Sequence, residues 1–325
     1  KTQLGDIRYF TENQLIKEMN LPPALFGYTI DVIIPVYNGY EYFDALLAGV
    51  RKTNMKYRLL IVNDKSPDER VLPYLERYAA THQEVVLLNN EENLGFLKSV
   101  NKALKMTENH VVLLNTDVEV PYQWLERLMM PIIFGDKIAS STPFTTCGTI
   151  CSFPKFCEDN PMFEGLRLWQ VDNVFRTIRP QYPVMPTGVG FCMGMNQQAV
   201  KEIGLLDEEN FGKGYGEEND WCQRAAKAGY SNVQVDNLFV YHKHGGSFLS
   251  EEKQRLLEEH SKALLKKHPN YNREVEEYCQ SDPMKSVRLY VSMQLLNQLL
   301  DIKTTVAFDH SLGGGATEYL EAKKE

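Results

Sequence analysis

The first half of the chain alternates short apolar runs with amphipathic segments. Runs rich in branched residues predict strands at 31–37, 58–63, 84–88 and 111–114. The segments between them have helical spacing, at 40–52, 69–80 and 94–106. Strands separated by single helices predict an α/β fold with a mostly parallel sheet, flanked by helices. In such a sheet, ligands bind at the carboxyl ends of the strands.

The pattern is less regular after the fourth predicted strand. We expect Pro121 at the start of a helix, where its missing N–H costs nothing. Residues 144–186 hold prolines, aromatic residues and cysteines, and are interpreted as a loop-rich insertion that could cover a site. Further on, the sequence predicts a glycine-rich strand at 184–196, a helix at 217–228, one or two strands at 232–241, and helices at 251–268 and 284–300.

The tail changes character after residue 302. A short β-branched strand at 304–308, three glycines at 313–315 and a helix at 316–322 resemble the opening of a Rossmann-like unit. We therefore expect the natural polypeptide to continue into a second nucleotide-binding domain, with the helix at 284–300 docking that domain, a second subunit or a membrane surface. The predicted divisions are an N-terminal extension at 1–28, a main domain at 29–250, a helical extension or linker at 251–302 and a truncated second domain at 303–325.

Composition narrows the class of protein. The 325 residues carry a formal net charge of −8, which argues against nucleic-acid binding because phosphate backbones attract basic faces. There is no apolar run long enough for a membrane span and no signal peptide, so we expect a cytoplasmic location. Of the six cysteines, Cys147, Cys151 and Cys157 cluster. Reduced thiols are the favoured interpretation and a zinc site is the alternative.

Polar side chains follow the predicted strands at the edge where a ligand should bind. They are Asn38, Asp64, Asn93, Asn115 and Asp117. Two further groups stand out later in the chain: the carboxylates Glu217, Glu218 and Asp220 at a helix start, and the histidines His242 and His244 beside glycines. Each has a plain alternative, as a turn residue, a partner of the helix dipole or a solvated loop. Together they offer metal ligands and a general base.

Several motifs, in this order, resemble glycosyltransferase family 2 over roughly residues 30–250. They are IIPVYNG (33–39), LLIVNDKSPD (59–68), NEENLGFLKSVNKAL (90–104), VVLLNTDVEVP (111–121), GFCMGMNQQAVKEIGLLDE (190–208) and GYGEENDWCQRAAKAGY (214–230). The third is similar to the family's rhamnosyltransferase-like branch. The stretch DHSLGGG (309–315) resembles the start of a GT-B glycosyltransferase domain.

The resemblance implies a GT-A fold and an inverting, metal-dependent transfer from a nucleotide-sugar donor, with Mn²⁺ or Mg²⁺ as cofactor. The donor is expected to be a dTDP- or UDP-sugar, and the acceptor a bacterial surface glycan, free or lipid-linked, at the inner face of the cytoplasmic membrane. The implied roles are nucleotide-sugar binding for Pro35, Val36, Tyr37, Asp64, Asn93, Asn115 and Thr116, metal binding for Asp117 and His242 (or His244), catalysis for Glu218 with Glu217 as its neighbour or alternative, and an acceptor-side position for Trp221 and Glu217. A packing role for Trp221 is the equal alternative.

The sequence departs from the family pattern at two important positions. Asn115 stands where the first aspartate of the DXD motif is usual, and Glu218 stands where the base is usually aspartate. These departures keep a second hypothesis open, a catalytically inactive GT-A domain that acts as a binding or assembly module. A nucleotidyltransferase is a third class, but the loop after the first strand lacks the basic residues expected of one.

Overall fold

The computed structural model describes residues 19–212, 214–243 and 251–300. Within them lies a nine-stranded sheet in the order β3-β2-β1-β4-β8-β6-β9-β5, with β7 also paired to β9. The strands are β1 (Thr29–Val36), β2 (Lys56–Asn63), β3 (Val85–Asn89), β4 (His110–Leu114), β5 (Val118–Glu119), β6 (Ile138–Thr145), β7 (Val184–Met185), β8 (Cys192–Met195) and β9 (Ser231–His242).

The directions of the strands place most carboxyl ends at one edge of the sheet. β1 pairs in parallel with β2 and β4, and β2 with β3. β8 is antiparallel to both β4 and β6, so β6 runs in the same direction as β4. β9 is parallel to β6. The chain segments that follow β1, β2, β3, β4, β6 and β9 therefore leave the sheet on the same side.

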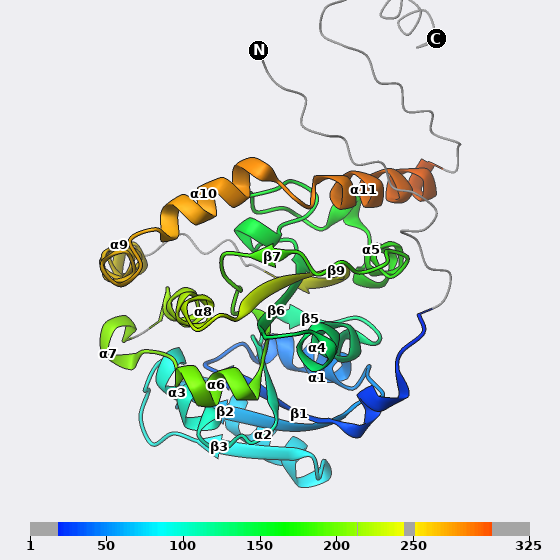
Figure 1. Cartoon of the computed structure of the whole chain (residues 1–325). Coiled ribbons are helices and arrows are strands. Elements are labelled where there is room, and N and C mark those ends of the chain that lie inside the picture. The colour runs from blue at the N-terminus through cyan, green and yellow to red at the C-terminus, as the bar shows by residue number, and fades with distance from the viewer. Residues whose placement is uncertain (1–18, 213, 244–250, 301–325) are drawn as a thin grey trace, which may run out of the picture.

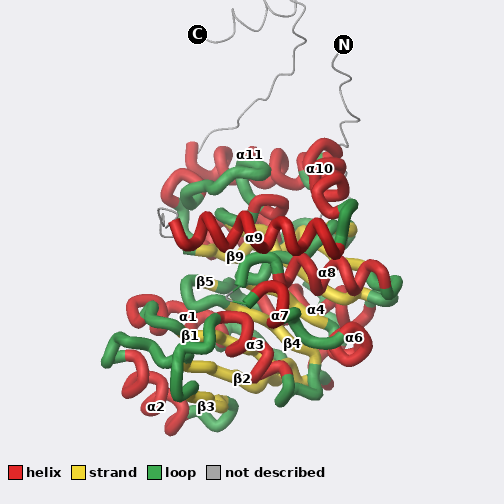
Figure 2. The backbone as a smooth tube through the Cα atoms, turned by 90° about the vertical axis from the view of Figure 1, so that its left-hand side faces the viewer, coloured by secondary structure: helices red, strands yellow, loops and turns green. Residues whose placement is uncertain are grey.

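Helices cover both faces of the sheet and one end of the molecule (Figure 1). They are α1 (Phe43–Val50), α2 (Val71–Thr81), α3 (Phe96–Leu104), α4 (Trp124–Phe134), α5 (Leu168–Phe175), α6 (Gln197–Ile203), α7 (Glu208–Phe211), α8 (Glu217–Lys227), α9 (Glu251–Lys267), α10 (Tyr271–Ser281) and α11 (Lys285–Leu300). α10 and α11 lie beyond β9, at the end of the molecule opposite β3. Figure 2 shows α9 between them and α7–α8.

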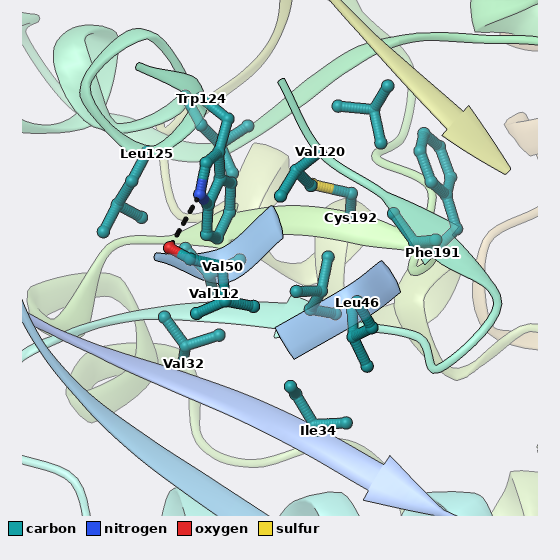
Figure 3. Close-up of a cluster of buried hydrophobic side chains, with 14 of the residues drawn as sticks. Val32, Ile34, Leu46, Val50, Val112, Val120, Trp124, Leu125, Phe191 and Cys192 are labelled. Atoms are coloured by element: carbon teal, nitrogen blue, oxygen red, sulfur yellow. Dashed lines mark hydrogen bonds between the residues drawn. The ribbon is translucent and has the colours of Figure 1, made fainter. Parts of the chain in front are cut away.

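Hydrophobic side chains fill the space on both faces of the sheet, as expected for parallel strands. Val32 and Ile34 of β1 join one core with α1 and α4, whereas Ile33 points to the other, with α3, α6 and α8. In the first core the indole N–H of Trp124 donates to the carbonyl of Val50 at 3.2 Å (Figure 3). Fully burying one such aliphatic side chain contributes about 2 kcal/mol, so this alternation along β1 fixes which face of the strand meets each core.

The predicted α/β architecture is confirmed, and the first four predicted strands and three predicted helices correspond to β1–β4 and α1–α3. Two predictions beyond the fourth strand are wrong. The strand predicted at 184–196 is two short strands, because the backbone N–H groups of Gly188 and Val189 between them bind side chains, Cys222 Sγ and Thr142 Oγ1. The helix expected at Pro121 begins only at Trp124, after Gln123 adopts a left-handed conformation (φ 55°).

The sequence did not reveal β6, because the middle of this strand is polar (Ser140, Ser141 and Thr142). It did not reveal α5 and α10 either. Ser140 and Ser141 of β6 are completely buried, and their hydroxyls donate to Asn232 Oδ1 and to the carbonyl of Leu128. The 144–186 segment thus contains the end of β6, α5 and short 3₁₀ turns at Thr149–Cys151 and Phe163–Gly165 in addition to loops.

The remaining predictions concern the ends of the chain. The helices predicted at 251–268 and 284–300 are present as α9 and α11. The tail elements predicted beyond residue 302, most of the N-terminal extension and His244 lie outside the described residues. None of the helices in the described part of the chain is long and apolar enough to cross a membrane.

Candidate active site

The loops after β1 and β2 are joined by polar contacts at the carboxyl edge of the sheet. The backbone N–H of Asn38 donates to Ser66 Oγ at 3.1 Å, and Asn38 Oδ1 accepts from the backbone of Asp68 at 3.3 Å. Tyr37 beside them is half exposed, with 53% of its surface accessible. Pro35 is partly buried, and Val36 belongs to the core, so Tyr37 is the one of these three predicted donor-site residues that presents a large accessible side chain.

Asp64, at the end of β2, organises the next loop. Its carboxylate is buried and accepts hydrogen bonds at 2.8 Å from the backbone N–H groups of Leu94 and Gly95 and from Asn90 Nδ2. Asn93 Oδ1 also accepts from Gly95 N–H, at 3.1 Å. The predicted role of Asp64 in binding the base of a nucleotide stays a prediction. The structure adds that Asp64 fixes the loop that carries Asn93.

A carboxylate and an imidazole meet where β5 and β9 pair. Asp117 Oδ2 lies 3.3 Å from His242 Nε2. The backbone sets this approach, because Val118 pairs with His242 and Lys243 N–H donates to the carbonyl of Asp117 at 2.8 Å. Asn115 and Thr116 precede Asp117 in the turn after β4, and Asn115 N–H donates to the carbonyl of Phe191. Residues 125 positions apart in the sequence are thus brought together.

The ring of His242 is held from two further directions. Its Nδ1 lies 3.2 Å from the carbonyl oxygen of Cys147, and Phe191 stacks on it with centroids 5.2 Å apart and an interplanar angle of 14°. Because a carbonyl can only accept, this contact requires Nδ1 to carry the proton. In the neutral ring, Nε2 then has a lone pair directed towards the Asp117 side. Sequence reasoning missed Phe191, which no motif marks as a partner of His242.

Two neighbouring carboxylates begin α8. Only three residues separate α8 from β9, and the helix packs against that strand. Glu217 is 5% exposed, and Glu218 is partly buried. One oxygen of each, Oε2, is buried without a hydrogen-bond partner among the described residues. A carboxylate oxygen in that state is unusual, because burying it without a partner is costly.

Burial shapes the acidity of this pair. Burial, and then the charge of Glu218, raise the pKa of Glu217 to about 8. Burial also raises the pKa of Glu218. The loop before them contains Gly214 and Gly216 with φ near 110°, a conformation that glycine adopts without strain. A raised carboxyl pKa is typical of a general base or acid.

Asp220, the third acidic residue of this cluster, has a different role. It is completely buried and accepts hydrogen bonds from Arg224 Nε and His268 Nε2, both at 2.8 Å, and from Lys267 Nζ at 2.7 Å. Burial alone would raise the pKa of Asp220, but these hydrogen bonds outweigh it and lower the pKa. Asp220 therefore fastens α8 to the end of α9. The sequence showed the acid but not its distant partners.

The expected acceptor-side position of Trp221 is corrected by the structure. Trp221 has no exposed surface, packs in the core between α6 and α8, and donates from its indole N–H to the carbonyl of Gly204 at 3.0 Å. It has no accessible face for an acceptor, so the packing alternative describes it. The acceptor-side position of Glu217, next to Glu218 at the start of α8, stays a prediction.

Among the described residues, no group of three or more histidines, cysteines, aspartates or glutamates is arranged to hold a metal ion. The six cysteines are free thiols, and the clustered Cys147 and Cys151 each contact a backbone carbonyl. Asp117 and His242 nevertheless fit a divalent cation that takes further oxygen ligands from a diphosphate and water. The imidazole lone pair and the carboxylate oxygen face each other at 3.3 Å, which is favourable when a proton or a cation lies between them.

Comparison with solved structures defines the fold class as that of GT-A glycosyltransferases. The mannosyltransferase PcManGT from Pyrobaculum calidifontis, solved in complex with GDP-Man and Mn²⁺, superposes with a TM-score of 0.56 at 14% identity, over 91% of this chain and 79% of that one. GalNAc-T7, solved with UDP, GalNAc and Mn²⁺, gives a TM-score of 0.55 at 15% identity, over 87% of this chain and 58% of that one. At these identities the similarity shows the fold alone.

Sequence comparison then identifies the family. Residues 31–204, more than half of the chain, match the glycosyl transferase family 2 model, and the chain belongs to that family. An uncharacterized glycosyltransferase of Haemophilus influenzae is 24% identical over 113 residues, which are 34% of this chain and 35% of that protein. The chain thus matches about a third of the length of this curated relative.

Proposed function

We propose that the chain is an inverting, metal-dependent glycosyltransferase that moves a sugar from a nucleoside diphosphate to a hydroxyl group of a growing glycan. One observation carries the proposal. Asp117 Oδ2 and His242 Nε2 approach each other as a pair of cation ligands would, and α8 begins with two neighbouring carboxyls, Glu217 and Glu218, each with a buried oxygen that has no hydrogen-bond partner among the described residues. Sugar transfer from a diphosphate needs both a means to neutralise the leaving group and a proton acceptor.

The roles of the protein residues follow from this placement. Glu218 accepts the proton of the acceptor hydroxyl. At the same time the oxygen of that hydroxyl bonds to the anomeric carbon, and the bond from this carbon to the diphosphate breaks. A single displacement of this kind inverts the configuration at that carbon. Asp117 and His242 would hold Mn²⁺ or Mg²⁺, which when bound supplies positive charge to the diphosphate. Tyr37 and the loops fixed by Asn38 and Asp64 would hold the nucleoside.

The donor and acceptor belong to the same proposal. The two solved relatives bind GDP-mannose and UDP with Mn²⁺, which supports a nucleotide-sugar donor and a divalent cation without naming the nucleotide. From the motifs we propose a dTDP- or UDP-sugar, a rhamnosyl or hexosyl group, and a bacterial surface glycan, free or lipid-linked, as acceptor. We further propose a cytoplasmic enzyme, peripheral to the inner membrane face, joined in one polypeptide to another glycosyltransferase domain.

Release of nucleoside diphosphate tests the roles of the carboxylates. The wild type and the Glu218→Gln, Glu217→Gln and Glu209→Gln variants are each incubated with Mn²⁺ and a panel of UDP-, dTDP- and GDP-sugars plus glycan acceptors. We expect acceptor-dependent release to fall at least a hundredfold in Glu218→Gln with donor affinity kept, and to be unaffected in Glu209→Gln, whose exposed residue lies in α7.

The other results discriminate between the hypotheses. Loss of activity in Glu217→Gln with Glu218→Gln active would transfer the role of base to Glu217. A protein that binds a donor but transfers nothing with any acceptor, or binds none, would support the inactive binding module, which the asparagine at position 115 favours.

A further inference from the structure

Two cysteines far apart in the sequence meet near the surface of the molecule. Cys157 Sγ and Cys279 Sγ are 3.2 Å apart, although the residues are separated by 122 positions. Cys157 is exposed, Cys279 is partly buried, and both are free thiols. The other four cysteines are buried or partly buried, and no comparable thiol contact joins any of them among the described residues.

The two sulfurs belong to separately braced parts of the fold. Cys157 lies in the loop 146–160, which is tied together by Asn160: its Nδ2 donates to the carbonyls of Thr146, Lys155 and Glu158. Cys279 lies on α10, which is anchored to β9 because Tyr278 Oη donates to Gln234 Oε1 at 3.0 Å. The thiol contact therefore lies between a loop and a helix that each have their own supports.

We propose that Cys157 and Cys279 are a redox-active pair that forms a reversible disulfide within one chain when the protein meets an oxidant of the peroxide class. The sulfur of Cys157 attacks one peroxide oxygen, so that an S–O bond forms, the O–O bond breaks and hydroxide leaves. The sulfur of Cys279 then attacks the resulting sulfenic acid, forming the S–S bond and releasing water. Two thiols and one peroxide give one disulfide and two waters, and the two thiol protons end in those waters.

The surroundings of the pair predict how its rate depends on pH. Although Cys157 as a residue is exposed, partial desolvation of its sulfur, followed by the contact with the Cys279 thiol, raises the pKa of Cys157 to about 12, with Asp282 acting in the same direction and Arg288 opposing it. Because the thiolate is the attacking species, the reaction is slow at neutral pH and its rate should rise roughly tenfold for each pH unit.

The link would also restrict the unfolded chain. It would close a loop of 122 residues, and long closed loops lose the most unfolded-state entropy. We expect the oxidised protein to melt roughly 5 °C higher than the reduced protein. This inference does not depend on transferase activity, so it stands or falls separately from the proposed function.

The test uses the full chain, oxidised with hydrogen peroxide, alkylated and digested with trypsin without reduction. The expected peptides, 156–167 and 274–285, contain one cysteine each, so a linked pair identifies the bond in a mass spectrum. We expect this species in the wild type and in the matched Cys147→Ser variant, its loss in Cys157→Ser and Cys279→Ser, and its disappearance after dithiothreitol.

Three results would overturn the proposal. In the first, Cys157 is oxidised to sulfinic or sulfonic acid while Cys279 is still alkylated. In the second, the linked pair forms only between chains, in proportion to protein concentration. In the third, both thiols stay fully alkylatable at an oxidant concentration that converts a free model thiol. Because Cys157 is exposed, we expect the Cys157→Ser variant to fold. A melting temperature equal to that of the wild type under reducing conditions would verify this.

Discussion

Glu217 is an almost completely buried carboxyl group at the start of α8. Its pKa of about 8 means that the folded protein keeps this proton where the unfolded chain, with an ordinary value of 4.5, has released it. The folded state therefore binds more protons than the unfolded state between these values. The free energy of unfolding should fall as pH rises through that window, by up to about 1.4 kcal/mol per pH unit.

The fall of the free energy of unfolding with rising pH gives a prediction for Glu217→Gln. The substitution removes the titration, so the variant should gain stability relative to the wild type as the pH is raised from about 5 to about 8. Urea unfolding of both proteins at several pH values measures the difference. Parallel curves for the two proteins would show that Glu217 has an ordinary pKa in the folded state.

Phe191 is predicted to act through His242. A stacked aromatic pair contributes about 1 kcal/mol, so loss of the ring should weaken cation binding by roughly fivefold. We expect this in Phe191→Leu when Mn²⁺ binding is followed by electron paramagnetic resonance with a nucleoside diphosphate present. Phe134→Leu, which changes a half-exposed ring at the end of α4, is the matched control. Equal affinities in the two variants would mean that the stack does not position the histidine.

At the scale of elements, the local hydrophobic pattern predicted the strands whose buried side chains are apolar. It did not predict the strand whose buried side chains are polar. The strands β1 to β4 are hydrophobic runs, and their periodicity predicted them. β6 is as central in the sheet, but its two buried serines donate their hydroxyl hydrogens to partners in other elements, Asn232 Oδ1 and the carbonyl of Leu128. Such partners cannot be seen in a window of sequence. α10 was missed because its exposed surface is charged and Tyr278 is its one buried residue.

The contact between α8 and α9 is predicted to depend on Asp220. Removing its charge leaves Lys267, Arg224 and His268 without their common partner inside the protein, and breaking a buried charged network costs about 3 kcal/mol or more. We expect Asp220→Asn to lower the free energy of unfolding by that amount and to increase hydrogen exchange in α9.

An exposed residue of α9 supplies the control for that prediction. Glu258→Gln changes the same helix at its solvent face and should alter the free energy of unfolding by less than about 0.5 kcal/mol. If Asp220→Asn were as stable as Glu258→Gln, the hydrogen bonds and ion pairs of Asp220 would contribute little to the free energy of unfolding, and other contacts would hold α9 against α8.

At the scale of the whole molecule, the sequence motifs nominate residues for the chemistry but do not show which side chains and carbonyls hold them in place. The motifs selected Asp117, Glu217, Glu218 and His242, and the pairing of β5 with β9 brings Asp117 and His242 together. What positions them could not be predicted: Phe191 and the Cys147 carbonyl on His242, and His268 on Asp220, come from other elements. Motifs fix residue types locally, whereas these partners depend on how distant elements pack.

The account as a whole requires that the family 2 fold of this chain bind a nucleoside diphosphate together with a divalent cation. The arrangement of Asp117 and His242 makes the cation and the diphosphate interdependent, since each supplies part of the other's surroundings. Binding should therefore show coupling: each ligand should stabilise the protein more in the presence of the other. A protein with an unrelated use for this fold would show no such coupling.

The most direct measurement is a thermal-shift titration of the wild type and Asp117→Ala with UDP, dTDP and GDP, each with and without Mn²⁺. We predict that one nucleotide raises the melting temperature of the wild type by several degrees only when Mn²⁺ is present, and that this rise is lost in Asp117→Ala, which otherwise melts like the wild type. A wild type that responds to no nucleotide at millimolar concentration, or an Asp117→Ala variant that keeps the full metal-dependent shift, would contradict the account.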